Sequence, residues 1–429
     1  MRFITVLLGL IFGLTAAFAQ TGAWYGNLKV QNIELPLVFH FEDENPTLDS
    51  PAQGARGIPM EMKRADNKII VQIPVIGASY EGVVINGKIE GSFKQGGLEF
   101  PLTLTAEEVK VNRPQTPQPP FPYTQEEVTF ANGDALLKGT LVLPESYDID
   151  TPVVIMITGS GLQNRDEELF QHKPFAVIAD ALARQGIASL RYDDRGFGES
   201  SGDVVNCTTE DFKNDAKAGV EMLKKRFHHV GALGHSEGGT IALMLGTDND
   251  VDFIVSLAGM SVAGSSTLID QNRNMLISKG VPQNIADNYC RLLSDTFKAI
   301  SHEEASPDPD QYNLPQSLIT NYKEALQQLQ TPYFKYFINL DIAPILNDIK
   351  VPVLALNGTK DTQVDCKSNL ETLRKGLPHN PVNVIKSVEG VNHLFQHCQT
   401  GLLEEYGSIE ETMVPEVLSQ IADWINSLQ

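Results

Sequence analysis

The sequence predicts an α/β domain with a mostly parallel β-sheet, preceded by a small all-β domain. Between residues 125 and 429, short apolar runs typical of buried strands alternate with amphipathic helical stretches, apart from a strand-free insertion at 261–350. Closely spaced strand patterns fill residues 20–111, and a proline-rich linker at 112–124 separates the two regions. Continuous apolar strands that alternate with helices are typical of a parallel sheet covered on both faces.

The composition limits the classes of partner. The chain has 429 residues, which favours two or three domains at about 150 residues each. With 42% hydrophobic residues it can fill their cores. The formal charge of −21 argues against nucleic-acid partners, because neutralising phosphates requires clustered Lys and Arg. The oligomeric state stays open.

Residues 1–19 predict a secretory signal peptide. Arg2 precedes an apolar run from Phe3 to Leu14, and an A-x-A pattern ends at Ala19. The run is shorter than the ~20 residues of a spanning helix. No cysteine stands at the cleavage point, as it would in a bacterial lipoprotein. We therefore expect export to the periplasm or the medium, without stable membrane insertion.

The N-terminal β region contains several alternating strand patterns. They include 69–75 and 98–104, together with 82–89, which predicts two strands joined by a turn at Asn86-Gly87. Short strands at close spacing favour a small barrel or sandwich. We expect a structural or docking role for this domain rather than ligand binding. The following stretch, 112–123, has five prolines and predicts a semi-rigid polyproline II spacer.

The second region begins with an antiparallel strand pair at 127–130 and 135–143. The further elements that we expect are strands at 153–157, 188–192, 253–258 and 351–356, and helices at 175–185, 211–226 and 415–428. The insertion at 261–350 is rich in helix formers, notably at 284–299 and 318–329. Because ligands bind at the carboxyl ends of the strands in such sheets, the insertion is a candidate lid. The alternative is a helical hairpin remote from the site.

Gly-His-Ser-Glu-Gly-Gly at 234–239 contains the candidate nucleophile, Ser236. It lies between a strand pattern at 229–233 and a helix pattern at 240–245. A G-x-S-x-G sequence on a strand-to-helix turn is typical of a nucleophile elbow, which exposes the serine hydroxyl above the sheet. By itself the motif is also compatible with an ordinary glycine-rich turn.

A serine nucleophile needs a base and a group that orients this base, here expected in the order Ser, Asp, His. Asp361 lies in the turn just beyond the strand at 351–356, and His393 lies beyond the strand pattern at 382–388. We therefore predict Asp361 as the acid and His393 as the base. Asp365 is the competing acid, but it stands where a helix begins and is expected to cap it.

The other histidines are weaker candidates. His393 and His397 form an H-x-x-x-H pair without a third ligand, so we expect no metal site. His235, inside the elbow, is expected to pack beside the sheet. Oxyanion stabilisation requires backbone N–H donors, and we assign them to Glu237 and Ser160, with Leu162 as the alternative to Ser160.

Taken together, these motifs resemble the α/β-hydrolase superfamily. The resemblance rests on the elbow, on Asp194-Arg195-Gly196-Phe197-Gly198-Glu199-Ser200, on 358–361 and on Asn392-His393, and it is strongest to bacterial esterases of the serine-aminopeptidase and monoglyceride-lipase-like group. It covers residues 125–429 and implies the α/β-hydrolase fold, carboxylic-ester hydrolysis of a small-molecule acyl ester and no cofactor. Thr158 departs from the pattern, because many relatives have His there. The β domain is similar to N-terminal domains of some exported bacterial hydrolases.

The expected chemistry is two-step acyl transfer through a Ser236, His393, Asp361 triad. Two alternatives stay open: an aminopeptidase or amidase that uses the same triad, and a non-catalytic binding protein. The cysteines add a smaller expectation. Export allows disulfides among Cys207, Cys290, Cys366 and Cys398. A Cys366–Cys398 bond would brace the acid and base loops, and free buried thiols are the alternative.

Overall fold

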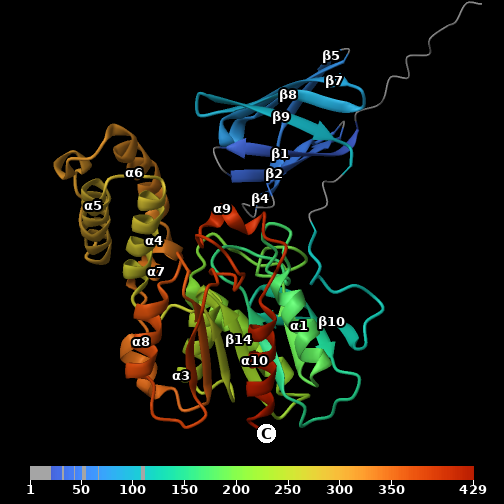
Figure 1. Ribbon diagram of the computed structural model, residues 1–429, viewed down its shortest axis with the longest axis vertical. Coiled ribbons are helices and arrows are strands. Elements are labelled where there is room, and N and C mark those ends of the chain that lie inside the picture. Colours follow the sequence, from blue (N-terminus) through green and yellow to red (C-terminus); the bar gives the residue numbers. More distant parts are fainter. Residues whose placement is uncertain (1–20, 31–32, 43, 51–54, 66, 108–111) are drawn as a thin grey trace, which may run out of the picture. The chain divides into compact units, whose positions relative to one another are not determined.

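The computed structural model describes residues 21–30, 33–42, 44–50, 55–65, 67–107 and 112–429. The chain forms two compact units, residues 1–110 and 111–429 (Figure 1). The predicted signal peptide at 1–19 lies outside the described residues.

The first unit is a nine-stranded antiparallel sheet in the order β4-β3-β2-β1-β9-β8-β7-β6-β5. Its strands are β1 Gly22–Val30, β2 Ile33–Phe41, β3 Thr47–Ser50, β4 Ala55–Pro59, β5 Glu61–Ala65, β6 Lys68–Ile73, β7 Ala78–Ile85, β8 Lys88–Gln95 and β9 Leu98–Thr105. A short 3-10 helix, η2 (Pro74–Ile76), joins β6 to β7. The expected turn at Asn86-Gly87 joins β7 to β8, with a positive φ at both residues.

This sheet curls around its own apolar core. Phe39 on β2 and Tyr80 on β7 are fully buried, and their ring centroids are 5.3 Å apart. In the order of the sheet the two strands are four positions apart, which would be about 19 Å in a flat sheet. The prediction of an all-β domain with a barrel-like or sandwich core is thus confirmed.

The proline-rich segment is not a free spacer over its first residues, because it is bound to the C-terminal part of the second unit. The Arg113 guanidinium donates hydrogen bonds of 2.8 Å to the carbonyl oxygens of Gly407 and Ile409. The Gln115 side chain donates to the Met413 carbonyl oxygen at 2.6 Å and accepts from the Met413 N–H at 3.0 Å. Side-chain hydrogen bonds to the backbone therefore fix a segment whose own backbone forms neither helix nor strand.

The second unit contains an eight-stranded sheet in the order β10-β11-β13-β12-β14-β15-β16-β17. Its strands are β10 Thr124–Asn132, β11 Ala135–Leu143, β12 Val153–Ile157, β13 Ala188–Tyr192, β14 Val230–His235, β15 Ile254–Leu257, β16 Val353–Gly358 and β17 Val384–Val388. β11 pairs antiparallel with both neighbours, and the strands from β13 to β17 pair in parallel. The mostly parallel sheet is as predicted.

Helices cover both faces of this sheet (Figure 1). One face packs against α2 (Thr209–Leu223), α3 (Glu237–Thr247) and α8 (Cys366–Gly376). The opposite face packs against α1 (Pro174–Arg184) and α10 (Pro415–Asn426). The cover on both faces accounts for the continuous apolar sequences of the central strands, which are buried throughout. A single short turn of helix, α9 (Leu403–Tyr406), precedes α10.

The insertion forms a helical subdomain between β15 and β16. It contains α4 Gly264–Ser278, α5 Gln283–Ser301, α6 Gln316–Leu329 and α7 Pro332–Asn339, and the 3-10 helices η3 Pro309–Tyr312 and η4 Ala343–Asp348. The two helices expected within it fall inside α5 and α6. Its helices share an apolar core of their own, which includes Leu292, Phe297 and Tyr322. The chain leaves the sheet at the carboxyl end of β15, the position expected for a lid.

Candidate active site

Ser236 occupies a strained turn between β14 and α3. Its φ of +54° and ψ of −121° lie where residues with side chains are rarely found. The flanking glycines are required by close packing. A Cβ at Gly234 would lie 1.9 Å from the Gly238 carbonyl oxygen, and a Cβ at Gly238 would lie 2.0 Å from the Ile157 carbonyl oxygen. This conformation is that of a nucleophile elbow, as the motif predicts.

The structure pairs the predicted acid with the predicted base. Asp361 follows β16, and its Oδ1 accepts hydrogen bonds from the N–H groups of Gln363 at 2.8 Å and Val364 at 2.9 Å. Its Oδ2 lies 2.7 Å from His393 Nδ1, and both side chains are buried. The competing Asp365 instead caps α8, where it accepts from the Ser368 N–H at 2.8 Å.

A compact turn holds His393 in this position. The Asn392 Oδ1 accepts from the N–H groups of Leu394 and Gln396, both at 3.0 Å. The Asn392 Nδ2 donates to the Gln396 Oε1 at 2.9 Å, and both side chains are fully buried. The base is thus positioned by a hydrogen-bonded loop rather than by a helix, so His393 and His397 do not share a helical face.

The elbow residue that precedes the nucleophile contacts the base, because the ring centroid of His235 is 4.6 Å from that of His393. In the part of the chain that the structure describes, the Ser236 hydroxyl has no hydrogen-bond partner. The structure therefore joins acid to base and brings the elbow beside them, without a bond between base and nucleophile.

The loop after β12 passes directly beside Ser236. A Cβ at Gly159 would lie 3.1 Å from the Ser236 Cβ. The Gly159 N–H is already used, because it donates to the Glu167 Oε1 at 2.8 Å. This leaves the next amide along the loop, that of Ser160, as the predicted oxyanion donor beside the amide of Glu237. Both assignments stay predictions.

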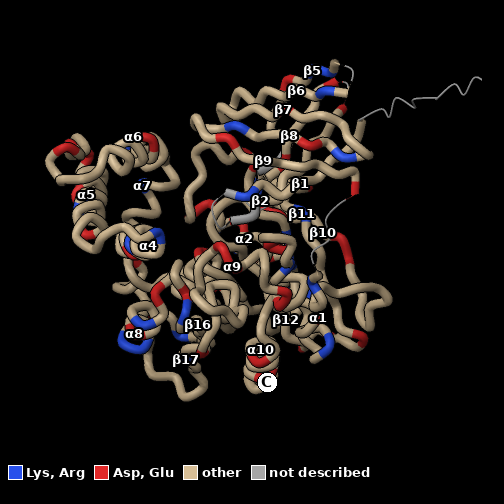
Figure 2. The backbone as a smooth tube through the Cα atoms, turned by 45° about the horizontal axis from the view of Figure 1, so that its top comes forward, with Lys and Arg blue, Asp and Glu red and all other residues tan. Residues whose placement is uncertain are grey.

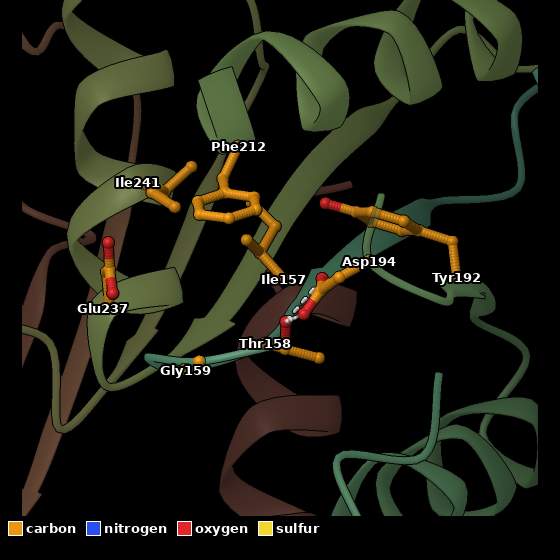
Figure 3. A pocket seen from close by; sticks show the side chains of 9 residues that line it. Ile157, Thr158, Gly159, Tyr192, Asp194, Phe212, Glu237 and Ile241 are labelled. Atoms are coloured by element: carbon orange, nitrogen blue, oxygen red, sulfur yellow. Dashed lines mark hydrogen bonds between the residues drawn. The ribbon is translucent and has the colours of Figure 1, made fainter. Parts of the chain in front are cut away.

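Thr158, which departs from the family pattern, anchors this loop to Asp194. The Thr158 hydroxyl lies 2.9 Å from the Asp194 Oδ1, and the Gln163 N–H donates to Oδ2 at 2.7 Å (Figure 3). Burial raises the pKa of Asp194 well above its usual range. The residues around this anchor line a cavity of about 10 Å³, which is room for roughly one water molecule and too small for an acyl chain.

The helical insertion, which is the candidate lid, contacts the elbow through Tyr333 on α7. Its hydroxyl donates to the Glu237 Oε2, while the Thr209 hydroxyl donates to Oε1 at 2.7 Å. The Tyr333 hydroxyl also forms a hydrogen bond with the Ser160 side chain. Burial, together with the Glu237 carboxylate, raises the pKa of Tyr333 well above its usual value. Tyr333 thus touches both residues predicted to supply the oxyanion donors, and no sequence pattern pointed to it.

His235 is buried at the end of β14, as expected, and it also has two polar partners that the sequence did not predict. Its Nδ1 lies 3.0 Å from the Glu167 Oε1, and its Nε2 lies 2.9 Å from the His393 carbonyl oxygen. Burial opposes the charged form, but the Glu167 carboxylate outweighs it and the pKa of His235 is raised. Glu167 was not anticipated either, because it stands in the polar stretch Asn164-Arg165-Asp166-Glu167-Glu168, which has no recognisable motif.

Three further observations concern metals, disulfides and membranes. Within the described ranges, no three His, Cys, Asp or Glu side chains are grouped so as to hold a metal ion. All four cysteines are free, so the expected Cys366–Cys398 disulfide is not formed. The Cys366 thiol instead donates to the Asn357 carbonyl oxygen, and the Cys398 thiol donates to the Gly390 carbonyl oxygen. Of the helices that the structure describes, none has the length and apolarity to cross a bilayer.

Comparisons with known proteins agree with this architecture. The sequence profile of the family described as alpha/beta hydrolase fold matches residues 152–390. The chain is similar to Esterase EstD of Thermotoga maritima, with 25% identity over 280 residues, which are 64% of this chain and 61% of that protein. The match thus spans less than two thirds of this relative.

Among solved structures, an esterase of Pyrococcus furiosus aligns with a TM-score of 0.42 and 16% identity, over 75% of this chain and 98% of that one. Est1E of Butyrivibrio proteoclasticus aligns with a TM-score of 0.41 and 16% identity, over 70% and 98%. A proline iminopeptidase of Mycobacterium smegmatis gives a TM-score of 0.43 and 14% identity, over 70% and 98%.

Proposed function

Because the chain belongs to the alpha/beta hydrolase fold family, and because its elbow serine lies beside a bonded Asp–His pair, we propose that it is a serine esterase that hydrolyses small carboxylic esters. The observation that carries the proposal is the 2.7 Å bond between His393 Nδ1 and Asp361 Oδ2, next to a serine held in a strained turn. The similarity to an esterase of Thermotoga maritima supports the choice of an ester bond.

In the proposed mechanism, His393 Nε2 takes the proton of the Ser236 hydroxyl as its oxygen attacks the ester carbonyl. Asp361 accepts the Nδ1–H hydrogen bond, which fixes the tautomer that leaves Nε2 free as the base, and it stabilises the imidazolium. The backbone N–H groups of Ser160 and Glu237 stabilise the oxyanion, each worth about 3 kcal/mol of barrier. His393 then protonates the leaving alcohol and activates the water that hydrolyses the acyl-enzyme.

The carboxylates around Ser236 favour an ester over a peptide with a free amino terminus. An aminopeptidase needs a carboxylate to bind the substrate ammonium group. Glu167 and Glu237 are both buried, and each already accepts hydrogen bonds from the protein. Glu167 is paired with His235, and Glu237 accepts from Thr209 and Tyr333. We therefore place the aminopeptidase or amidase second and a non-catalytic binding protein third.

Parallel assays on ester and amide substrates distinguish the three possible functions. The wild-type chain and Ser236→Ala are compared on p-nitrophenyl acetate and butyrate and on aminoacyl-p-nitroanilides. We expect wild-type turnover of the esters only, and no turnover above background by a Ser236→Ala protein that keeps the wild-type circular dichroism spectrum. Faster anilide cleavage would replace the esterase by the peptidase, and unchanged ester turnover in Ser236→Ala would remove Ser236 from the mechanism.

We propose that the protein acts outside the cytoplasm, because residues 1–19 have the pattern of a secretory signal peptide. The 54 acidic residues outnumber the 33 basic ones, and Figure 2 shows acidic and basic residues interspersed along both units. This distribution supports a small-molecule substrate rather than a nucleic acid, and the proposed chemistry requires no cofactor.

A further inference from the structure

Glu167 and His235 connect two parts of the site that are distant in sequence. The Glu167 Oε1 accepts hydrogen bonds from the Gly159 N–H at 2.8 Å and from His235 Nδ1 at 3.0 Å. On the other side of the imidazole ring, Nε2 lies 2.9 Å from the His393 carbonyl oxygen. One chain of hydrogen bonds thus runs from the loop of the predicted oxyanion donor to the backbone of the proposed base.

The partners of His235 determine its charge. Both of its ring nitrogens face oxygen atoms, one of a carboxylate and one of a backbone carbonyl, and the carbonyl can only accept. A neutral imidazole has a single N–H, whereas an imidazolium can donate to both partners. Histidine is also the stronger base of the pair, so the proton resides on the ring. Glu167 and His235 are therefore an ion pair.

This ion pair lies in the interior of the protein. The exposed fractions are 3% for Glu167 and 5% for His235. A buried charge pair is weak as a source of stability, because desolvation offsets most of the Coulomb attraction. Glu167 also has a positive φ of 52°, and its Oε2 is buried with no hydrogen-bond partner among the described residues. Strain and an unsatisfied oxygen at one residue are features that functional sites retain.

We propose that Glu167 and His235 are positioning residues of the acyl-transfer site, which fix the oxyanion loop at Gly159 and the backbone of His393 relative to the elbow. The inference rests on the proposed esterase function and deepens it. His235 adds an electrostatic effect, since its ring centroid is 4.6 Å from that of His393. The titratable groups that face His235 are Glu167, His393 and, beyond His393, Asp361.

The test compares the wild-type enzyme with His235→Gln and Glu167→Gln in a pH series on p-nitrophenyl butyrate. Glutamine at 235 can still donate to the His393 carbonyl but carries no charge. Glutamine at 167 can still accept from Gly159 but leaves His235 without a counter-ion. We expect kcat to fall at least about tenfold in both variants, with KM within about threefold, because loss of the ion pair weakens the connection between the oxyanion loop and the backbone of His393.

The pH profile gives the readout that a merely structural role would not move. In His235→Gln a positive charge beside the site is replaced by a neutral side chain. We therefore expect the acid limb of kcat/KM to move to higher pH in this variant. His397→Gln is the matched control, because His397 and Glu411 form an exposed pair with the same 3.0 Å separation. This control keeps the wild-type kcat and profile.

The outcomes are distinct. Wild-type kcat and pH profile in both folded variants would overturn the positioning role while leaving the esterase proposal intact. Loss of the folded state in both variants at 25 °C would also overturn it, because the pair would then serve the fold rather than the site. A wild-type enzyme without esterase activity would contradict the proposed function itself, and this inference with it.

Discussion

At the scale of single residues, Asp361 uses its two carboxylate oxygens for different tasks. Oδ1 accepts the N–H groups of Gln363 and Val364, which fixes the orientation of the carboxylate, and Oδ2 faces His393. Backbone donors can only be satisfied by an acceptor, so this orientation persists when the residue is changed to an amide. Replacing Asp361 by an amide should therefore move the proton of His393 from Nδ1 to Nε2.

Asp361→Asn tests this arrangement. With the amide oxygen retained at the Oδ1 position, the NH₂ group faces His393 Nδ1 and forces the proton onto Nε2, where the base must be free. We expect kcat on p-nitrophenyl butyrate to fall by about 10²- to 10⁴-fold with little change in KM. Asp365→Asn is the control, because Asp365 only caps α8. Similar kcat values for the two variants would exclude Asp361 as the acid.

His172 provides a pH-dependent term in stability. Burial, aided by the nearby Arg113 guanidinium, lowers the pKa of His172 to about 4. Between pH 6.5 and pH 4 the unfolded chain binds a proton that the folded state does not, so stability decreases as the pH falls through this window, by up to about 3 kcal/mol.

The His172→Gln variant, which can still hydrogen-bond to the Tyr406 carbonyl, loses this term. Thermal denaturation at pH 7 and at pH 4.5 should show a smaller loss of stability on acidification in the variant than in the wild type. Equal losses in the two proteins would show that His172 does not account for the acid sensitivity.

At the scale of elements, the helical insertion is hydrogen-bonded to the loops of the proposed site at two points. Tyr333 on α7 reaches Glu237 and Ser160, and the Asn274 side chain on α4 donates to the Thr362 carbonyl oxygen at 3.1 Å, next to Asp361. The helical insertion therefore contacts the elbow, the oxyanion loop and the acid loop. A surface hairpin remote from the site would make none of these contacts.

Tyr333→Phe tests the first of these contacts. The change leaves a buried carboxylate oxygen of Glu237 without its donor and releases the Ser160 side chain, so we expect kcat/KM to fall by about tenfold. Tyr336→Phe, one turn along α7, removes a hydroxyl that binds Glu210 at 3.1 Å and should stay within about twofold of the wild type. Equal kcat/KM values in both variants would show that the Tyr333 contact does not contribute to catalysis.

The sequence predicted those parts of the site that depend on local rules. The elbow follows from a five-residue motif, and Asp361 and His393 follow from the rule that functional loops succeed the strands of a parallel sheet. Glu167, His235 and Tyr333 could not be assigned in this way, because their roles depend on tertiary contacts. Glu167 is 68 positions from His235, and Tyr333 is 96 positions from Glu237. The contacts of the proline-rich segment could not be predicted for the same reason. Arg113 binds carbonyl groups that are almost 300 positions away in the sequence.

At the scale of the whole molecule, all the residues of the proposed site belong to the second unit, between Thr158 and His393. That unit also includes the segment of Arg113 and Gln115, which binds the backbone around α9. The two units have separate apolar cores. We therefore expect the second unit to carry the catalytic groups without the β domain.

Two truncated chains test this division. A chain that starts at residue 111 should keep kcat on p-nitrophenyl butyrate within about threefold of the full-length value. A chain that starts at residue 124 lacks Arg113 and Gln115, leaves the carbonyl groups of Gly407 and Met413 without their donors, and should melt at a lower temperature. Loss of activity in the longer chain would show that the β domain contributes to the site.

The central claim is that Ser236 is a nucleophile activated by His393. Intact-mass spectrometry after treatment with a fluorophosphonate tests it directly, because the reagent phosphonylates only an activated serine. We predict one adduct per chain, mapped to Ser236 by peptide sequencing, absent in Ser236→Ala and formed at least about 10²-fold more slowly in His393→Ala. An unmodified wild-type chain, or an adduct that persists in Ser236→Ala, would contradict the account.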